Sequence, residues 1–324
     1  MEQRKLGDGP EVGALGFGCM GMSEFYGATN DEESLLTLEH AFAAGVTLFD
    51  TADIYGFGHN ECLLARFIHG KRDQVVIATK AGIVRSKSNP ALRGVDNSPA
   101  YLTAHCEESL ARLGTDHVEL YYLHRIDPAT PLDESIGTLA RLKAAGKIGG
   151  IGLSNVTLDT VRAAQRIHPV TAVQNEFSLF TRTDQADLIP ALASMGIAYI
   201  PYSPLGRGML TGGITARSLP ADDFRRNLPR FGEEAMTQNA RLVEALQAIA
   251  SGRGVTPAQV ALAWVLRQGS HVIPIPGTKR IRYLDENLAA QDIALSDDEI
   301  ATLHRLFDAL AVSGEPYPDM SFVR

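Results

Sequence analysis

Four side chains that can exchange protons with a carbonyl group occur at the ends of short apolar runs in this sequence: Asp50, Tyr55, Lys80 and His124. A buried ammonium at Lys80 needs a counter-charge, which Asp50 can supply. The same ammonium beside Tyr55 would stabilise the phenolate, lower the pKa of the phenol and make it a better acid. His124 can offer a ring N–H to a carbonyl oxygen. The set therefore predicts an array of donors for a carbonyl group that accepts hydride.

Each of these residues also has an ordinary structural interpretation. Lys80 and Asp50 can form a simple ion pair, a lone histidine is usually a satisfied hydrogen-bonding group, and Tyr55 can be a half-exposed loop residue beside Gly56. The catalytic interpretation depends on all four residues arriving at one place. A Schiff base on Lys80, as in barrel lyases, is a further alternative, but it needs a neutral amine and Asp50 favours the charged form.

The elements that must bring the four residues together alternate along the chain. Strand-like apolar runs occur at 14–19, 47–50, 75–79, 118–123, 148–153, 172–174, 197–202 and 272–275, and the helix-like segments between them include 30–43, 101–113, 136–145, 158–167, 187–195 and 260–266. Strict alternation predicts a parallel sheet covered by helices. Eight units without a glycine-rich fingerprint at the first strand–helix turn favour an α/β fold of the closed (β/α)8 TIM barrel type over an open doubly wound sheet. In a barrel the C-terminal strand ends face one mouth, where we expect all four residues.

Three additions to a minimal barrel are predicted, all within a single domain spanning residues 1–324. Residues 7–10, Gly-Asp-Gly-Pro, indicate a turn between two N-terminal strands that form a β-hairpin. Residues 211–239, rich in Pro, Gly and Arg, predict a long loop after the seventh strand. Ser296 with Glu299 forms a capping-box pattern that starts an extra C-terminal helix, and Asn30 with Glu33 forms the same pattern before the first helix.

Composition narrows the classes of function. The formal net charge of −8 argues against a nucleic-acid or anionic-membrane partner, because both favour basic surfaces. The cysteines, Cys19, Cys62 and Cys106, are too few and too scattered for a disulfide framework or a zinc site, so no metal is expected. Neither a signal peptide nor an apolar run of about 18 residues is visible. We expect a cytoplasmic protein that acts on a small molecule, with its oligomeric state open.

Longer motifs around these residues resemble the aldo-keto reductases. Segments 49–56 (FDTADIYG), 78–80 (ATK) and 121–125 (YYLHR) are similar to the catalytic segments of that family. The similarity continues through 16–22, 152–155, 173–176, 202–208, 275–280 and 286–287, and hence over nearly the whole chain. The His-Arg pair at 124–125 and the Gly-Thr-Lys-Arg stretch at 277–280 look most like the plant and microbial branch of the perakine reductase type.

The resemblance implies NADPH-dependent reduction of aldehydes or ketones to alcohols, with a role for each matching position. Tyr55 would be the general acid, Lys80 and Asp50 its tuning pair, and His124 the donor that orients the substrate. The positions implied to contact NADPH or NADP+ are Met20, Gly21, Asp50, Ser154, Asn155, Gln174, Tyr202, Ser203, Pro204, Leu205, Gly206, Gly208, Pro276, Gly277, Thr278, Lys279, Arg280, Tyr283, Glu286 and Asn287.

Within that set the resemblance implies a division of labour along the cofactor. Ser154, Asn155 and Gln174 would hold the nicotinamide carboxamide, and Tyr202 would stack under the ring. Backbone amides of Ser203, Leu205, Gly206 and Gly208 would lie along the pyrophosphate, and the segment after Gly208 would form a flap over it. Some members of the family carry small hydroxyl residues where this chain has Lys279 and Arg280, and Gln or Arg where it has Tyr283.

A cluster of cations favours NADPH over NADH. Lys279, Arg280 and Arg282 fall just after the predicted eighth strand, at the start of a helix, where the helix dipole opposes positive charge at a cost of about 0.3–1 kcal/mol each. A bound anion would turn this cost into a stabilisation, because the positive end of the helix dipole and the cationic side chains would then all attract it. The 2'-phosphate of NADP is such an anion. Three solvated surface charges are the alternative interpretation.

The substrate pocket is expected to be aromatic with one cation, which suits many aldehydes and some ketones. Its predicted residues are Met22, Phe25, Tyr26, Tyr55, Ile83, Val84, Tyr121, His124 and Arg125. The physiological substrate does not follow from the sequence. A slow or non-catalytic NADPH-binding regulatory barrel is the remaining alternative, and the presence of all four catalytic residues argues against it.

Overall fold

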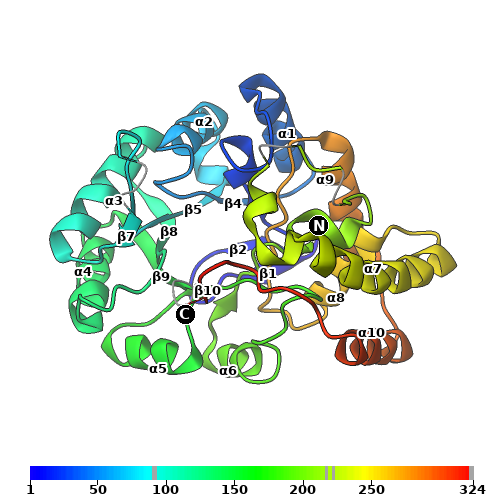
Figure 1. Cartoon of the computed structure of the whole chain (residues 1–324). Coiled ribbons are helices and arrows are strands. Elements are labelled where there is room, and N and C mark those ends of the chain that lie inside the picture. The colour runs from blue at the N-terminus through cyan, green and yellow to red at the C-terminus, as the bar shows by residue number, and fades with distance from the viewer. Residues whose placement is uncertain (90–92, 216–217, 221–222, 321–324) are drawn as a thin grey trace.

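Parallel strands form the centre of the molecule and helices form its outer layer (Figure 1). The computed structural model describes residues 1–89, 93–215, 218–220 and 223–320. Seven strands lie in the order β11-β10-β9-β8-β5-β4-β3, and every neighbouring pair is parallel. Their bounds are β3 Phe17–Gly18, β4 Leu48–Asp50, β5 Val76–Ala81, β8 Val118–Leu123, β9 Ile148–Ser154, β10 Ala172–Gln174 and β11 Ala198–Tyr199.

Residues 272–276 close this sheet into a barrel, although they are too irregular to form a regular strand. On one side the Ile273 amide donates to the Tyr199 carbonyl at 2.8 Å. On the other side the Gly16 amide donates to the Pro274 carbonyl at 3.0 Å. The predicted eighth strand therefore takes its place through backbone hydrogen bonds to both edges, and the (β/α)8 barrel is confirmed.

Helices follow the strands and cover the barrel from outside (Figure 1). The Asn30 side chain accepts from the amides of Glu32 and Glu33, which satisfies two donors at the start of the first helix. Ser296 and Glu299 form a full capping box, so the predicted extra C-terminal helix is confirmed. In the described ranges no helix is both long and apolar enough to cross a membrane. The helices are α1 Asp31–Ala43, α2 His59–Ile68, α3 Pro99–Leu113, α4 Leu132–Ala144, α5 Leu158–Ile167, α6 Leu188–Met195, α7 Glu233–Arg253, α8 Pro257–Leu266, α9 Ile281–Leu288 and α10 Asp297–Ala309.

The prediction of a loop through residues 211–239 is wrong at its C-terminal end. Short 3-10 turns occupy Gly206–Thr211, Phe224–Asn227 and Pro229–Phe231, but α7 already begins at Glu233. Two acidic residues in its first turn favour the helix start through the dipole. Ala235, Met236 and Leu242 are buried on one side of α7, so tertiary packing extends this helix beyond what the Pro- and Gly-rich composition suggests.

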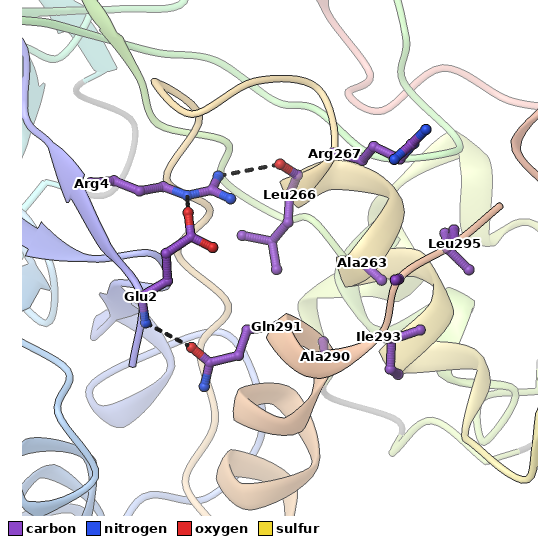
Figure 2. A pocket seen from close by; sticks show the side chains of 10 residues that line it. Glu2, Arg4, Ala263, Leu266, Arg267, Ala290, Gln291, Ile293 and Leu295 are labelled. Atoms are coloured by element: carbon purple, nitrogen blue, oxygen red, sulfur yellow. Dashed lines mark hydrogen bonds and ion pairs between the residues drawn. The ribbon is translucent and has the colours of Figure 1, made fainter. Parts of the chain in front are cut away.

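Two hairpins lie at opposite ends of the barrel. β6 (Ile83–Arg85) and β7 (Arg93–Val95) pair antiparallel directly after β5, a feature that the sequence analysis did not predict. β1 (Gln3–Lys5) and β2 (Glu11–Gly13) form the predicted N-terminal hairpin. Arg4 from β1 lies in a small pocket of about 180 Å³, where Figure 2 shows it beside Glu2 and the Leu266 carbonyl. Arg4 also donates to the carbonyl of Val272, so this pocket is a seam that ties the hairpin to the barrel.

Alternation along the strands decides which side chains face the barrel interior. On β5, Val76 and Ala78 belong to the interior cluster, whereas Ile77 packs against the helices. On β8, Tyr122 belongs to the interior and Tyr121 to the layer under the helices. Residues at even positions of these strands therefore form inward rows, which continue towards the C-terminal ends of the strands.

Candidate active site

The predicted catalytic residues continue the inward rows at one end of the barrel. Asp50 is the last residue of β4, Lys80 lies near the end of β5, and His124 directly follows β8. Parallel pairing places them at similar levels along the barrel axis, because Asp50 pairs with Ala78 and the His124 amide donates to the Ala81 carbonyl at 2.8 Å. The structure therefore brings these three side chains together, with Tyr55 on the loop that follows Asp50.

A buried ion pair lies at the floor of the site. Lys80 Nζ is fully buried and donates to Asp50 Oδ1 at 2.5 Å and to the Thr51 carbonyl at 2.6 Å. Gln174 Nε2 donates to the other carboxylate oxygen of Asp50 at 2.7 Å. Both oxygens of the carboxylate thus have donors, which is the condition under which a buried charge is tolerated.

Tyr55 and His124 stand above this ion pair. Their rings meet edge to face with centroids 6.0 Å apart, and Lys80 Nζ lies 5.2 Å from the centroid of the Tyr55 ring. Tyr55 is 9% exposed and His124 is 7% exposed, so both rings face the cavity from a mostly buried position. His124 Nδ1 is buried and has no hydrogen-bond partner among the described residues.

Burial, more than neighbouring charge, sets the proton affinities in this site. The pKa of Tyr55 is raised well above its ordinary value of 10, by burial first and then by the Asp50 carboxylate, while Arg125 opposes the shift. The net shift of this pKa is therefore upward, against the lowering expected from Lys80, because burial of the ring outweighs the neighbouring charges. Burial, Arg125 and Lys80 together hold the pKa of His124 well below its ordinary value of 6.5. Near neutral pH the site thus presents a protonated phenol and a neutral imidazole.

A cavity of about 1360 Å³ extends from the predicted catalytic residues along the strand ends to α9. Small-molecule sites commonly occupy roughly 300–1,000 Å³, so this space accepts a large ligand together with a small one. Nearly all the positions predicted to bind cofactor line it. These are Met20, Gly21, Asp50, Ser154, Asn155, Gln174, Tyr202, Ser203, Pro204, Leu205, Gly208, Pro276, Gly277, Thr278, Lys279, Arg280, Tyr283, Glu286 and Asn287.

The middle of the cavity is built from strand ends held in unusual backbone conformations. Asn155, Ser203 and Arg207 have φ of 54°, 51° and 56°, a region that residues other than glycine rarely adopt. Such strain persists only where surrounding structure imposes it, and it gathers at functional sites. Asn155 accepts from the Tyr202 hydroxyl at 2.8 Å, which fixes the tyrosine ring at the cavity wall.

The turn at 203–208 differs in part from its expected form. The amides of Gly206 and Gly208 donate to the carbonyls of Ser203 and Leu205 at 2.9 and 3.0 Å, so they are engaged within the turn. Gly206 is buried and lies behind the cavity wall. Of the positions expected along a pyrophosphate, Ser203, Leu205 and Gly208 therefore reach the cavity and Gly206 does not.

The predicted cation cluster divides into two kinds of side chain. Lys279 Nζ donates to the carbonyls of Tyr26 and Ala28 at 2.6 and 2.7 Å, so it ties the start of α9 to the loop at 25–28. Arg280 directly precedes α9, is exposed, and lies with Arg282 around the Tyr283 ring at the cavity edge. The two arginines, rather than Lys279, are thus the cations available at this end of the cavity.

Three of the predicted substrate-pocket residues do not reach the cavity. Phe25, Tyr26, Tyr55, Ile83, His124 and Arg125 line it. Tyr121 points to the opposite face of β8, under the helices, because it is one residue out of phase with Tyr122. Met22 is 1% exposed within the main hydrophobic core, and Val84 is paired with Gly94 in the β6–β7 hairpin.

Two irregular segments cover the cavity, one at 224–227 and one in the tail after α10. Phe224 packs on Phe25 with ring centroids 4.7 Å apart, and the Arg225 guanidinium lies 5.1 Å from the centroid of the Tyr26 ring. These contacts join the segment at 224–227 to the loop at 25–28 across the cavity. Composition alone could not reveal them, because both partners lie in irregular stretches.

The other covering segment is the tail after α10, which runs back across the molecule in Figure 1. It places the Tyr317 hydroxyl 3.0 Å from that of Tyr202 and the Tyr317 ring 4.5 Å from the Arg207 guanidinium. Arg207 in turn donates to Glu176 Oε2 at 2.8 Å, and both side chains are buried. No pattern in the tail distinguishes Tyr317 as a cavity residue.

Comparisons with known proteins agree with this geometry. The family model described as the aldo/keto reductase family matches residues 14–308. A probable aldo-keto reductase 1 from Glycine max is 41% identical over 314 residues, covering 95% of this chain and 88% of that protein.

Solved structures are similar over the same extent. A glycerol dehydrogenase from Gluconobacter oxydans is 26% identical with a TM-score of 0.87, covering 98% of each chain. An aldo-keto reductase from Klebsiella pneumoniae, solved in complex with NADPH, is 27% identical with a TM-score of 0.76, covering 100% of this chain and 99% of that one. The matched length and the identity to the Glycine max protein show that the chain belongs to the aldo/keto reductase family.

Proposed function

We propose that this chain is an oxidoreductase that reduces aldehydes or ketones to alcohols with NADPH, using Tyr55 as the proton donor. The observation that carries the proposal is the convergence of Tyr55, His124 and the Lys80–Asp50 pair at one end of the cavity that the predicted cofactor positions line. The family and the NADPH complex of the Klebsiella pneumoniae relative support it.

The residues along the cavity fit a dinucleotide. Near the catalytic end, Ser154, Asn155 and Gln174 offer amide and hydroxyl groups for a carboxamide, and Tyr202 offers a ring face. Beyond them the turn at 203–208 and the helix start at Arg280 suit phosphate groups. Bound there, NADPH supplies the hydride for the carbonyl carbon.

The chain's own groups handle the proton. As negative charge develops on the carbonyl oxygen, the Tyr55 hydroxyl donates its proton to that oxygen. His124 is neutral because its pKa is depressed, so it can donate one ring N–H to the same oxygen without placing a cation in the site. Lys80 neutralises Asp50, which would otherwise oppose charge on the phenolate and on the reacting oxygen.

Preference for NADPH over NADH is assigned to the arginines at α9. Arg280 and Arg282 lie at the cavity edge beside Tyr283, where a 2'-phosphate can pair with a guanidinium and with the helix start. All three cysteines are free, in agreement with a reducing, cytoplasmic location.

The test is oxidation of NADPH, followed optically, with a panel of aromatic, aliphatic and sugar carbonyls. Turnover with at least one class, and formation of the matching alcohol, is the expected result. Absence of turnover across the panel despite tight NADPH binding would favour the regulatory alternative. Borohydride trapping of an imine at Lys80 would favour the lyase alternative, which the contacts of Lys80 with Asp50 and Thr51 argue against.

A further inference from the structure

The loop that carries Tyr55 is strained directly after the tyrosine. Gly56, Phe57 and Gly58 have φ of 58°, 56° and 89°, so three consecutive residues adopt the left-handed region. Phe57 is not a glycine, and such a conformation costs on the order of 1–3 kcal/mol. A loop of this kind keeps its shape only if contacts on both sides hold it.

One side of the loop is held by Asn60. The Asn60 side chain accepts from the Thr51 hydroxyl at 2.7 Å and donates to the Cys19 carbonyl at 2.9 Å. The backbone amide of Asn60 donates to the Tyr55 carbonyl at 3.2 Å. These three contacts involve neutral groups. The Asn60 side chain also donates to Ser23 Oγ at 2.7 Å, and Ser23 Oγ lies 2.8 Å from Nδ1 of His59, whose Nε2 pairs with the Asp31 carboxylate, so His59 is an ionisable group on this side of the loop.

The other side is held by an ionisable pair. Asp53, two residues before Tyr55, has a side chain only 2% exposed, and its Oδ2 accepts from His105 Nδ1 of α3 at 2.8 Å. The Asp53 amide also donates to the Lys80 carbonyl at 3.1 Å, so the residue links α3 to the strand end beside the catalytic ion pair. Tyr101 stacks on the His105 ring with centroids 3.8 Å apart and fixes its orientation.

His105 is the group that offsets the buried charge of Asp53. The other oxygen, Asp53 Oδ1, is buried and has no hydrogen-bond partner among the described residues. Arg112 is the nearby cation, but its guanidinium is engaged by Glu61 Oε2 at 2.6 Å. A buried carboxylate with one donor depends heavily on that donor's charge.

The pKa values of both members of the pair are shifted upward. Hydrogen bonding to Asp53 raises the pKa of His105 above its ordinary value of 6.5, with Glu108 adding to the shift and Arg112 and burial opposing it. Burial and Glu61 raise the pKa of Asp53. Because the folded pKa of His105 is raised, its stabilising contribution is complete below 6.5 and disappears as pH rises through the folded value.

The Asp53–His105 pair acts on Tyr55 through the backbone of the loop and not through its charge. The carboxylates that raise the pKa of the Tyr55 phenol are Asp50 and Glu24, so Asp53 is not a main source of the field at the hydroxyl. Its side chain points away from the cavity towards α3, since it contacts His105 and does not line the cavity. Asp53 and His105 are thus positioning residues for the loop.

We propose that Asp53 and His105 form a pH-dependent clamp that fixes the Tyr55 loop against α3, so that proton delivery by Tyr55 weakens when His105 loses its proton. This role rests on the proposed function of Tyr55. Misplacing a catalytic group by about 1 Å can cost on the order of a hundredfold in rate, so even a small shift of the loop is measurable.

The test compares wild type with His105→Gln and Asp53→Asn. His40→Gln is the matched control, because His40 also pairs with a carboxylate, Asp285 at 2.7 Å, but both side chains are exposed and their pairing does not involve the Tyr55 loop. Turnover and KM for 4-nitrobenzaldehyde at saturating NADPH are measured between about pH 6 and about pH 9, across the range where histidine titrates. Hydrogen exchange of the peptide covering residues 54–60 is measured on the same proteins.

In wild type and His40→Gln, kcat should fall as pH rises through the His105 ionisation, and exchange protection of residues 54–60 should fall with it. His105→Gln should lack this step, with kcat lowered about tenfold at low pH. Its NADPH affinity should stay within about twofold, because the clamp does not touch the cofactor positions. Asp53→Asn should behave in the same way, and it decides the question if His105→Gln does not fold.

Two results would overturn the clamp. One is a variant with a lowered melting temperature but an unchanged kcat profile and unchanged exchange of residues 54–60, which is what a merely structural pair would give. The other is a wild-type profile without an ionisation in this range. If wild type shows no carbonyl reduction at all, the proposed function fails, and the exchange measurement still decides whether the clamp exists.

Discussion

Replacing Lys80 with methionine keeps most of the side-chain volume and removes the ammonium. Asp50, nearly buried, then loses its 2.5 Å partner and keeps only the donor from Gln174. Removing one member of a buried ion pair costs about 3–5 kcal/mol of folding free energy. Lys71→Met is the matched control: its ammonium also lies over an aromatic ring, 4.6 Å from the Phe67 centroid, but its partner Glu39 is exposed. That control should lose at most about 1 kcal/mol.

The folding free energy that Lys80→Met loses should depend on pH. Lys80 lowers the pKa of Asp50 against the effect of burial, so Lys80→Met raises the folded pKa of Asp50 further. A carboxyl group whose folded pKa exceeds its unfolded value binds a proton more readily when folded, and stability then falls as pH rises between the two values. The free energy of unfolding of Lys80→Met should therefore lie closer to that of wild type at about pH 5 than at about pH 8.

Urea unfolding followed by circular dichroism at both pH values measures this difference. Asp50→Asn combined with Lys80→Met removes both charges and should be at least about 1 kcal/mol more stable than Lys80→Met alone at about pH 8. Carbonyl reduction by Lys80→Met should fall sharply, because the unpaired Asp50 raises the pKa of Tyr55 still further. A loss below about 1 kcal/mol that is the same at both pH values would refute the electrostatic reasoning.

Two further predictions follow from the cofactor end and from the barrel core. Arg280→Ala should weaken NADPH binding about tenfold or more and leave NADH binding little changed. Lys279→Ala should weaken the binding of both cofactors alike, because Lys279 holds the loop at 25–28. Equal effects of Arg280→Ala on the affinities for the two cofactors, measured by fluorescence titration, would contradict a 2'-phosphate contact. Gly152→Ala should lower the free energy of unfolding, measured with urea, by about 1–3 kcal/mol, because a Cβ there would lie 2.2 Å from the Tyr122 ring. Gly252→Ala meets nothing within 4 Å and should stabilise α7 by about 0.5–1 kcal/mol. Similar effects of the two substitutions would contradict the packing around Gly152.

The meeting of Asp50, Lys80 and His124 at one end of the barrel was predictable, because it depends on strand order and on alternation along the strands. Asp50, Lys80 and His124 each end or follow an apolar run, and parallel register then places them side by side. The same alternation could have excluded Tyr121, which lies an odd number of residues before His124 and therefore faces the helices.

Features built from irregular segments were not predictable. Tyr317 reaches the cavity because the tail after α10 folds back, and Lys279 is occupied because the loop at 25–28 presents carbonyl groups to it. The direction of the Tyr55 pKa shift also escaped prediction, since it depends on how completely the ring is buried and on the prior pairing of Lys80 with Asp50.

The most direct test of the account is Tyr55→Phe, which removes one hydroxyl and keeps the ring. The phenyl ring should keep its contacts with His124 and Lys80, so the fold and NADPH affinity should be nearly unchanged. Carbonyl reduction at saturating NADPH should fall by at least about a hundredfold, the lower end of what a general acid contributes. Steady-state reduction within a few-fold of wild type, with NADPH affinity intact, would contradict the assignment of Tyr55 as the proton donor.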